Sequence, residues 1–155
     1  MEPMPPQSPA NPGRLDSLMY GGIDRMEMGC VYFAVHIPEG LVKIGYTGKD
    51  EPYTRFKHLR ATNPPGLRLL GWMHMGGPQL ERNIHRHMKP HWITGEWFDF
   101  GSKWGRSKVV YILYCDGIWE DDDLDELQTA GDMQAIRRLV TKRYVLIENA
   151  NGVSR

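Results

Sequence analysis

The chain has few cysteines and no long apolar run, the two features that would indicate a disulfide-rich or a membrane protein. Only two of its 155 residues are cysteines, Cys30 and Cys115, and we expect both to be small core residues. Neither a disulfide framework nor a thiolate zinc site is therefore indicated. No run of about 18 apolar residues exists, and Met1–Gly13 lacks both a charged leader and a hydrophobic segment. We therefore expect a soluble, intracellular (cytoplasmic) protein without a membrane span.

The formal net charge is also zero, but the charges are unevenly distributed. Residues 30–110 contain 12 basic and 6 acidic residues, a net charge of +6, together with all six histidines. Residues 1–29 contain 2 basic and 4 acidic residues, and residues 111–155 contain 5 and 9. A basic body between acidic ends is typical of proteins that bind a polyanion. We therefore expect a polyanion as the partner.

The sequence predicts one main domain between two extensions. Residues 1–29 contain five prolines and little apolar periodicity, which predicts a largely disordered N-terminal tail. Residues 30–101 form the expected main domain, and residues 102–155 form a C-terminal extension. Three elements are expected in this extension, namely a strand, one or two helices and a last strand: Val109–Cys115, Leu124–Leu139 and Arg143–Glu148.

Short segments with strand and helix character alternate in the main domain. They occur in the order strand, strand, helix, strand, helix: Cys30–Ile37, Leu41–Tyr46, Asp50–Ala61, Leu67–Met73 and Gln79–His87. The first two strands flank Pro38-Glu39-Gly40 and predict a β-hairpin. We therefore expect an α/β (α+β) fold, in which helices flank a small, central, mainly antiparallel three-stranded sheet and a C-terminal α/β extension follows.

Two spacings place polar side chains near one another. A turn symmetric about Glu39 would set Tyr32 opposite Tyr46 in the hairpin. On the second helix, Glu81 and His85 are four residues apart and project from one face. A carboxylate and an imidazole can share a site there, although such a pair taken alone is more often a surface contact.

The order of these residues resembles the GIY-YIG nuclease superfamily over about residues 30–100. The segments LVKIGYT, RFKHLRATNPPGLRLLGWM, LERNIHRHM and GEWFDF resemble the branch found in phage proteins and in a fungal meiotic gene product. The first motif reads Cys30-Val31-Tyr32 and keeps only the tyrosine, and Lys43 of Lys43-Ile44-Gly45 stands at the usual tyrosine position. Some restriction enzymes of the superfamily also carry that lysine, so the substitution does not predict an inactive enzyme.

The resemblance implies a metal-dependent DNA endonuclease that hydrolyses phosphodiester bonds. Tyr32 would be the general base, Lys43 would lower the pKa of its phenol, and Tyr46 would assist or orient the water. Arg55 would bind the scissile phosphate through its planar fork of donors. Glu81 would hold one Mg²⁺ or Mn²⁺ ion, with His85 beside it as a supporting group or proton donor.

Further basic residues are candidates for contacts with the nucleic-acid backbone, which would give salt-sensitive and largely sequence-independent affinity. These residues are Lys57, Arg60, Arg68, Arg82, Arg86 and Lys89. The alternative for each is a solvated surface charge. A zinc site at His85, His87 and His91 is disfavoured, because the first two point to different helix faces and no HExxH or cysteine pattern completes a tetrahedron.

Three functions are compatible with these patterns. The endonuclease is favoured, a nucleic-acid-binding module of the same fold that acts with a protein partner is the main alternative, and the +6 body disfavours an interaction domain without nucleic acid. Glu96 would either reach the site or cap a sheet edge. The acidic segment Glu120–Glu126 would either begin a solvated helix or fold over the basic region and limit access to DNA.

Overall fold

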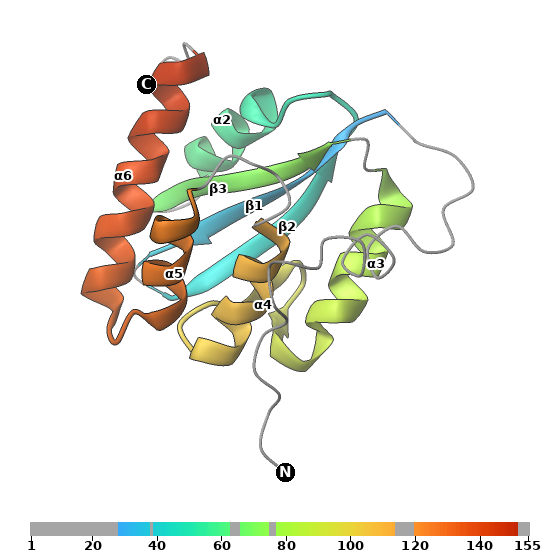
Figure 1. Cartoon of the computed structure of the whole chain (residues 1–155). Helices are drawn as coiled ribbons and strands as arrows, with labels where there is room; N and C mark the ends of the chain where they lie inside the picture. Colours follow the sequence, from blue (N-terminus) through green and yellow to red (C-terminus); the bar gives the residue numbers. More distant parts are fainter. Residues whose placement is uncertain (1–27, 38, 63–65, 75–76, 114–119, 152–155) are drawn as a thin grey trace.

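A computed structural model describes residues 28–37, 39–62, 66–74, 77–113 and 120–151 (Figure 1). The tail predicted for residues 1–29 lies outside the described residues, apart from Met28 and Gly29.

The centre of the fold is one antiparallel sheet of five strands in the order β3-β1-β2-β5-β4. The strands are β1 (Cys30–His36), β2 (Leu41–Thr47), β3 (Leu67–His74), β4 (Trp92–Thr94) and β5 (Trp97–Asp99). The mixed α/β class and the antiparallel centre are confirmed. The sheet has five strands instead of three, because the segment around Gly95-Glu96 folds into a short hairpin that pairs with β2.

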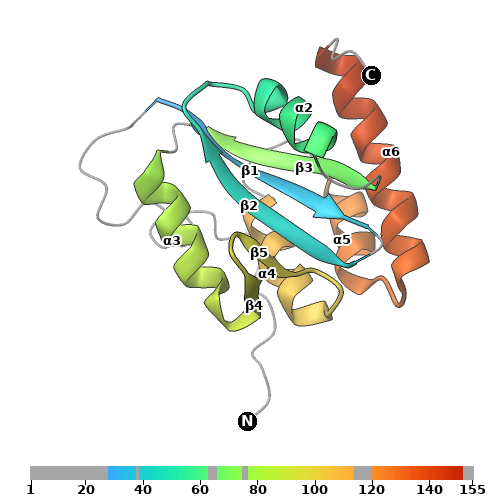
Figure 2. The ribbon, with the colours of Figure 1, turned by 180° about the vertical axis from the view of Figure 1, so that it is seen from behind.

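Helices cover both faces of this sheet. They are α2 (Tyr53–Thr62), α3 (Pro78–Met88), α4 (Lys103–Leu113), α5 (Asp121–Thr129) and α6 (Met133–Asn151), with the 3₁₀ helix η1 (Lys89–His91) after α3. The two opposite views show α2 on one face, α4 and α5 on the other, and α3 beside the β2 side of the sheet (Figures 1 and 2). No helix in the described ranges is long and apolar enough to cross a membrane.

Strand β1 is buried on both faces, and its side chains alternate between two hydrophobic clusters. Val31, Phe33 and Val35 belong to the cluster that contains buried residues of α3, α4, α5 and α6. Tyr32 and Ala34 belong to the cluster that contains buried residues of α2. The face of the sheet on which Tyr32 lies is therefore the α2 face.

The C-terminal extension is helical, which corrects two expected strands. Most of the apolar run Val109–Cys115 lies in α4, and Arg143–Glu148 lies in α6; Cys115 itself is outside the described residues. Helix α4 is buried along most of its length, and a short apolar run in a buried helix cannot be distinguished from a strand by periodicity. The expected helix start in the acidic segment is confirmed, since α5 begins at Asp121.

The hairpin register differs by one residue from the expected one. Tyr32 pairs with Gly45, Val31 with Tyr46, and Ala34 with Lys43. The turn is therefore not symmetric about Glu39; it ends at Gly40, whose φ of +64° lies in the left-handed region that glycine favours. This shift moves Tyr46 away from Tyr32, because side chains on neighbouring positions of a strand point to opposite faces.

Gly45 makes room for the ring of Tyr32. A Cβ atom at Gly45 would overlap Tyr32 Oη and Cζ. Gly45 of β2 pairs with Tyr32 of β1, so the Tyr32 ring packs against the backbone of β2 at a position without a side chain.

We predict that Gly45→Ala lowers the free energy of unfolding by about 1–3 kcal/mol, because the added methyl group displaces the buried Tyr32 ring. Urea denaturation followed by circular dichroism measures this change. Gly131→Ala is the matched control, because a Cβ atom there would have no atom within 4 Å. Equal stability of the two variants would contradict the overlap.

Arg106 ties α4 to two other segments. Its side chain is 1% exposed, and it donates hydrogen bonds to backbone carbonyls next to β5 and around the end of α5. The acceptors are Phe100 O at 3.2 Å and Gly101 O, Leu127 O and Ala130 O at 2.8 Å each. A buried guanidinium with its donors satisfied in this way holds these segments in one arrangement.

We predict that Arg106→Met lowers the free energy of unfolding by about 2–4 kcal/mol, because it leaves buried carbonyl oxygens without their donors. The measurement is again urea denaturation, and Arg137→Met on the exposed side of α6 is the control. A loss no larger than that of the control would show that Arg106 does not fasten these segments.

Candidate active site

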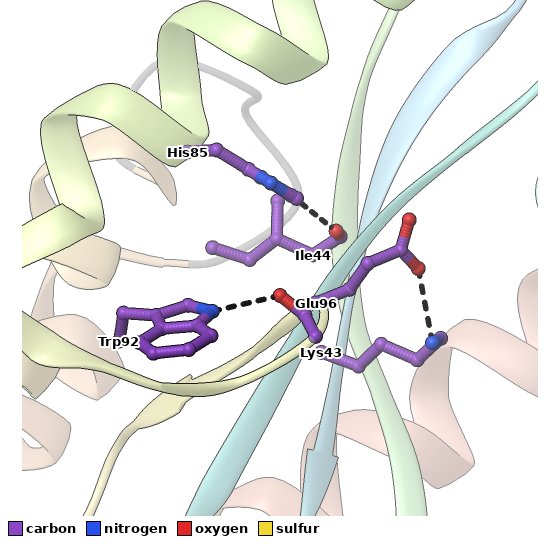
Figure 3. A network of polar contacts seen from close by, with 6 residues as sticks. Lys43, Ile44, His85, Trp92 and Glu96 are labelled. Atoms are coloured by element: carbon purple, nitrogen blue, oxygen red, sulfur yellow. Dashed lines mark hydrogen bonds and ion pairs between the residues drawn. The ribbon is translucent and has the colours of Figure 1, made fainter.

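The site is built where β5 stops pairing with β2. Strand β5 pairs with β2 only as far as Lys43. The next backbone N–H, that of Ile44, donates to Glu96 O at 3.0 Å, and Ile44 O accepts a hydrogen bond from His85 Nε2 at 2.7 Å. Helix α3 thus takes over from β5 along the edge of β2 (Figure 3).

His85 fixes the rotation of α3 against this edge. Because a carbonyl oxygen can only accept, the Nε2 atom of His85 carries a hydrogen in this contact. The ring also packs edge-on against Phe98, with centroids 5.0 Å apart. The i,i+4 spacing predicted that Glu81 would lie on the same helix face one turn earlier, and its electrostatic interaction with His85 agrees with that placement.

Glu96 belongs to the site, which the sequence had left open. It lies in the turn between β4 and β5, and its Oε1 atom forms an ion pair of 3.0 Å with Lys43 Nζ (Figure 3). The Lys43 ammonium also lies 5.4 Å from the ring centroid of Trp97. The β5–β2 pairing sets this contact, and no local pattern in the sequence showed that pairing.

Glu81 and Glu96 lie close enough for their carboxyl groups to interact electrostatically. Burial raises the pKa of Glu81, and the negative charge of Glu96 raises it further, against the smaller effects of His85 and Lys43. Two carboxyl groups, one from α3 and one from the β4–β5 turn, thus place negative charge together, and a cation near them would relieve their repulsion.

The two carboxyl groups fit a magnesium-type ion. Such an ion is commonly held by one or two protein carboxylates, with waters and substrate phosphate oxygens completing its shell. Within the described ranges no group of three or more His, Cys, Asp or Glu residues could hold a metal ion.

Tyr32 and Arg55 complete the site on the α2 face. Tyr32 is 1% exposed, and burial raises the pKa of its phenol. A hydrogen bond from Arg55 and the charge of that residue oppose this rise, whereas the charges of Glu96 and Glu81 add to it. The cation next to Tyr32 is thus Arg55, while Lys43, which was expected to lower this pKa, is ion-paired with Glu96.

Tyr46 is not brought to this site. It pairs with Val31, which points into the cluster on the face opposite Tyr32. The expected pairing of Tyr46 with Tyr32 is therefore wrong, and this placement gives no support to a role for Tyr46 beside the attacking water.

The expected backbone-binding residues separate into three groups. Lys57 and Arg60 are exposed on α2, the helix that carries Arg55. A second exposed group follows the other side of the site on α3 and η1, and it consists of Arg82, Arg86 and Lys89. Arg68, on β3, is the exception. It pairs with Val35 of β1, so its side chain points to the face opposite Tyr32.

The acidic helix α5 lies on the far side of the sheet. Its Leu124 and Leu127 are buried in the same cluster as Val31, on the face opposite Tyr32. The hypothesis that this acidic segment folds over the site is therefore wrong.

His85 and His87 lie on different sides of α3, as their spacing predicted. While His85 contacts β2, the backbone carbonyl of His87 accepts a hydrogen bond from Lys108 Nζ of α4 at 3.2 Å. Burial lowers the pKa of His87 to about 4, and the charges of Lys108 and His91 contribute. No zinc-binding group of these histidines forms among the residues that the structure describes.

The lowered pKa of His87 predicts loss of stability in acid. Its ordinary pKa of 6.5 falls to about 4 in the folded state, so the unfolded chain binds more protons between these values and stability falls as pH falls. Because the ring is partly solvent-exposed, we expect the free energy of unfolding of His87→Gln to fall by only about 1–2 kcal/mol less than that of wild type between pH 7 and pH 5. Urea titrations at pH 7, 6 and 5 measure it, with the exposed His58→Gln on α2 as control. Parallel pH profiles of wild type and His87→Gln would refute the assignment.

One comparison with known proteins identifies the main domain. The family model of the T5orf172 domain matches residues 29–111, which include every residue of the site described above. This domain is found in phage proteins and is related to nuclease-type folds. No curated protein and no solved structure is significantly similar to the chain. The chain belongs to the T5orf172 domain family.

Proposed function

We propose that the protein is a metal-dependent DNA endonuclease that hydrolyses phosphodiester bonds by a GIY-YIG-type mechanism with one Mg²⁺ or Mn²⁺ ion. The observation that carries the proposal is the pair of carboxyl groups of Glu81 and Glu96 beside Tyr32 and Arg55. Membership of a nuclease-associated family supports the same class of function.

Glu81 and Glu96 would hold the metal ion. Their carboxyl groups interact electrostatically, and they are hard oxygen ligands of the kind that magnesium and manganese prefer. When bound, the ion would stabilise negative charge on the phosphoryl and leaving oxygens. Lys43 would position Glu96 through the 3.0 Å ion pair, and His85 would position Glu81 by holding α3 against β2.

Arg55 would bind the scissile phosphate. It lies on the exposed side of α2, and its guanidinium reaches the hydroxyl group of Tyr32. A guanidinium presents five donors in a plane, so one hydrogen bond to Tyr32 leaves donors for phosphate oxygens. Lysine has no planar fork and would not reproduce such a two-point contact.

Tyr32 would orient the attacking water and would act as its base at alkaline pH. The raised pKa of the phenol means that it keeps its proton at neutral pH. The phenolate fraction increases as pH rises towards that pKa, so the cleavage rate should increase with pH above neutrality. Tyr32→Phe should remove this increase.

The second candidate function is nucleic-acid binding without cleavage. A buried Tyr32 with a raised pKa and a Lys43 side chain already ion-paired with Glu96 are also consistent with a site that binds nucleic acid without cleaving it. In that case the protein would be a DNA-binding or RNA-binding module that acts with a partner.

Plasmid nicking separates these two functions. With Mg²⁺ or Mn²⁺ present, we expect wild type to nick supercoiled DNA, and Glu81→Gln, Glu96→Gln and Arg55→Lys each to be slower by about 100-fold or more. Glu126→Gln, at an exposed position of α5, and Arg137→Lys, at an exposed position of α6, are matched controls for charge and substitution type. Equal nicking by all variants would overturn the assigned site, whereas tight binding by a wild type that does not nick would favour the binding module.

A further inference from the structure

Two large hydrophobic side chains are exposed on the outer strand of the hairpin that carries Glu96. Trp92 and Ile93 of β4 are 56% and 49% exposed, and we call them the hairpin patch. Strand β4 is the outermost strand on this side of the sheet, and its three residues are all exposed. The patch is therefore open to solvent in the free protein.

The ring of Trp92 is held in one orientation. Its indole Nε1–H donates to Gly95 O at 2.9 Å, and Gly95 directly precedes the site residue Glu96 (Figure 3). This hydrogen bond satisfies the polar atom of the indole, so what remains exposed is the apolar surface of the ring. Because this hydrogen bond already restricts the ring, the Trp92 side chain loses less conformational entropy when a flat ligand stacks on it.

Two cations precede the patch in the chain. Lys89 and Arg86 are exposed just before β4. An aromatic ring flanked by cations matches a nucleotide, since the ring can stack on a base while the cations contact phosphates. A second protein strand is a poorer match, because a strand of three residues offers few backbone hydrogen bonds.

We propose that the hairpin patch stacks against an unpaired base of the bound nucleic acid, so that single-stranded or locally unpaired DNA binds better than a continuous duplex. Bases inside a duplex have both faces covered by their neighbours, so only an unstacked base can offer a face to Trp92. This inference rests on the proposed function, because it takes nucleic acid to be the ligand of the site.

Fluorescence anisotropy with a labelled single strand and the matching duplex, without divalent metal, tests the inference in the full chain. We expect wild type to prefer the single strand, and Trp92→Ala to weaken single-strand binding about 5- to 100-fold while changing duplex binding less than about 2-fold. Trp92→Phe keeps a ring and should retain most of the affinity. Trp104→Ala removes another exposed tryptophan, 37% exposed on α4, and should have no effect.

The outcomes distinguish this inference from the proposed function. If wild type binds neither nucleic acid, the proposed function fails and the inference fails with it. If wild type binds DNA but Trp92→Ala binds the single strand as well as Trp104→Ala does, only the inference is overturned. Light scattering that shows a dimer of wild type but not of Trp92→Ala would assign the patch to a second copy of the chain and would also overturn it.

Discussion

The register between β1 and β2 is the constraint on which the site depends. Side chains alternate between the faces of a sheet, so the register decides which residues share the α2 face. Tyr32 lies over Gly45, where a side chain would overlap its ring, and this same register puts Lys43 on the Tyr32 face and Tyr46 on the other. A slip by one residue would exchange the faces and separate the polar residues of the site.

The second half of the site depends on a short β5. Because its pairing with β2 ends at Lys43, the next residue, Ile44, is free to bind two other elements through its backbone. Its N–H contacts the turn that carries Glu96, and its carbonyl contacts His85 of α3. One peptide segment of β2 thus brings two carboxyl groups together from parts of the chain 15 residues apart.

The main domain was largely predictable from local patterns, and the extension was not. Alternating and β-branched segments, with Pro and Gly at their ends, gave the strands and helices of residues 30–88 to within a few residues. Val109–Leu113 reads as a strand, because a helix buried along most of its length has no polar face to set a helical period. The buried Arg106, which links α4 to the end of α5, likewise has no local signature.

The sequence by itself determined the α/β class, the spacing of Glu81 and His85 on one helix face, and the basic character of the main domain. These depend on residues close together in the chain or on composition alone. Only the tertiary structure decided that Glu96 joins the site, that Tyr46 leaves it, and that the acidic helix α5 lies on the other face of the sheet. Strand register, sheet edges and the choice of face are set by contacts between distant segments, and such contacts leave no periodic pattern in the sequence.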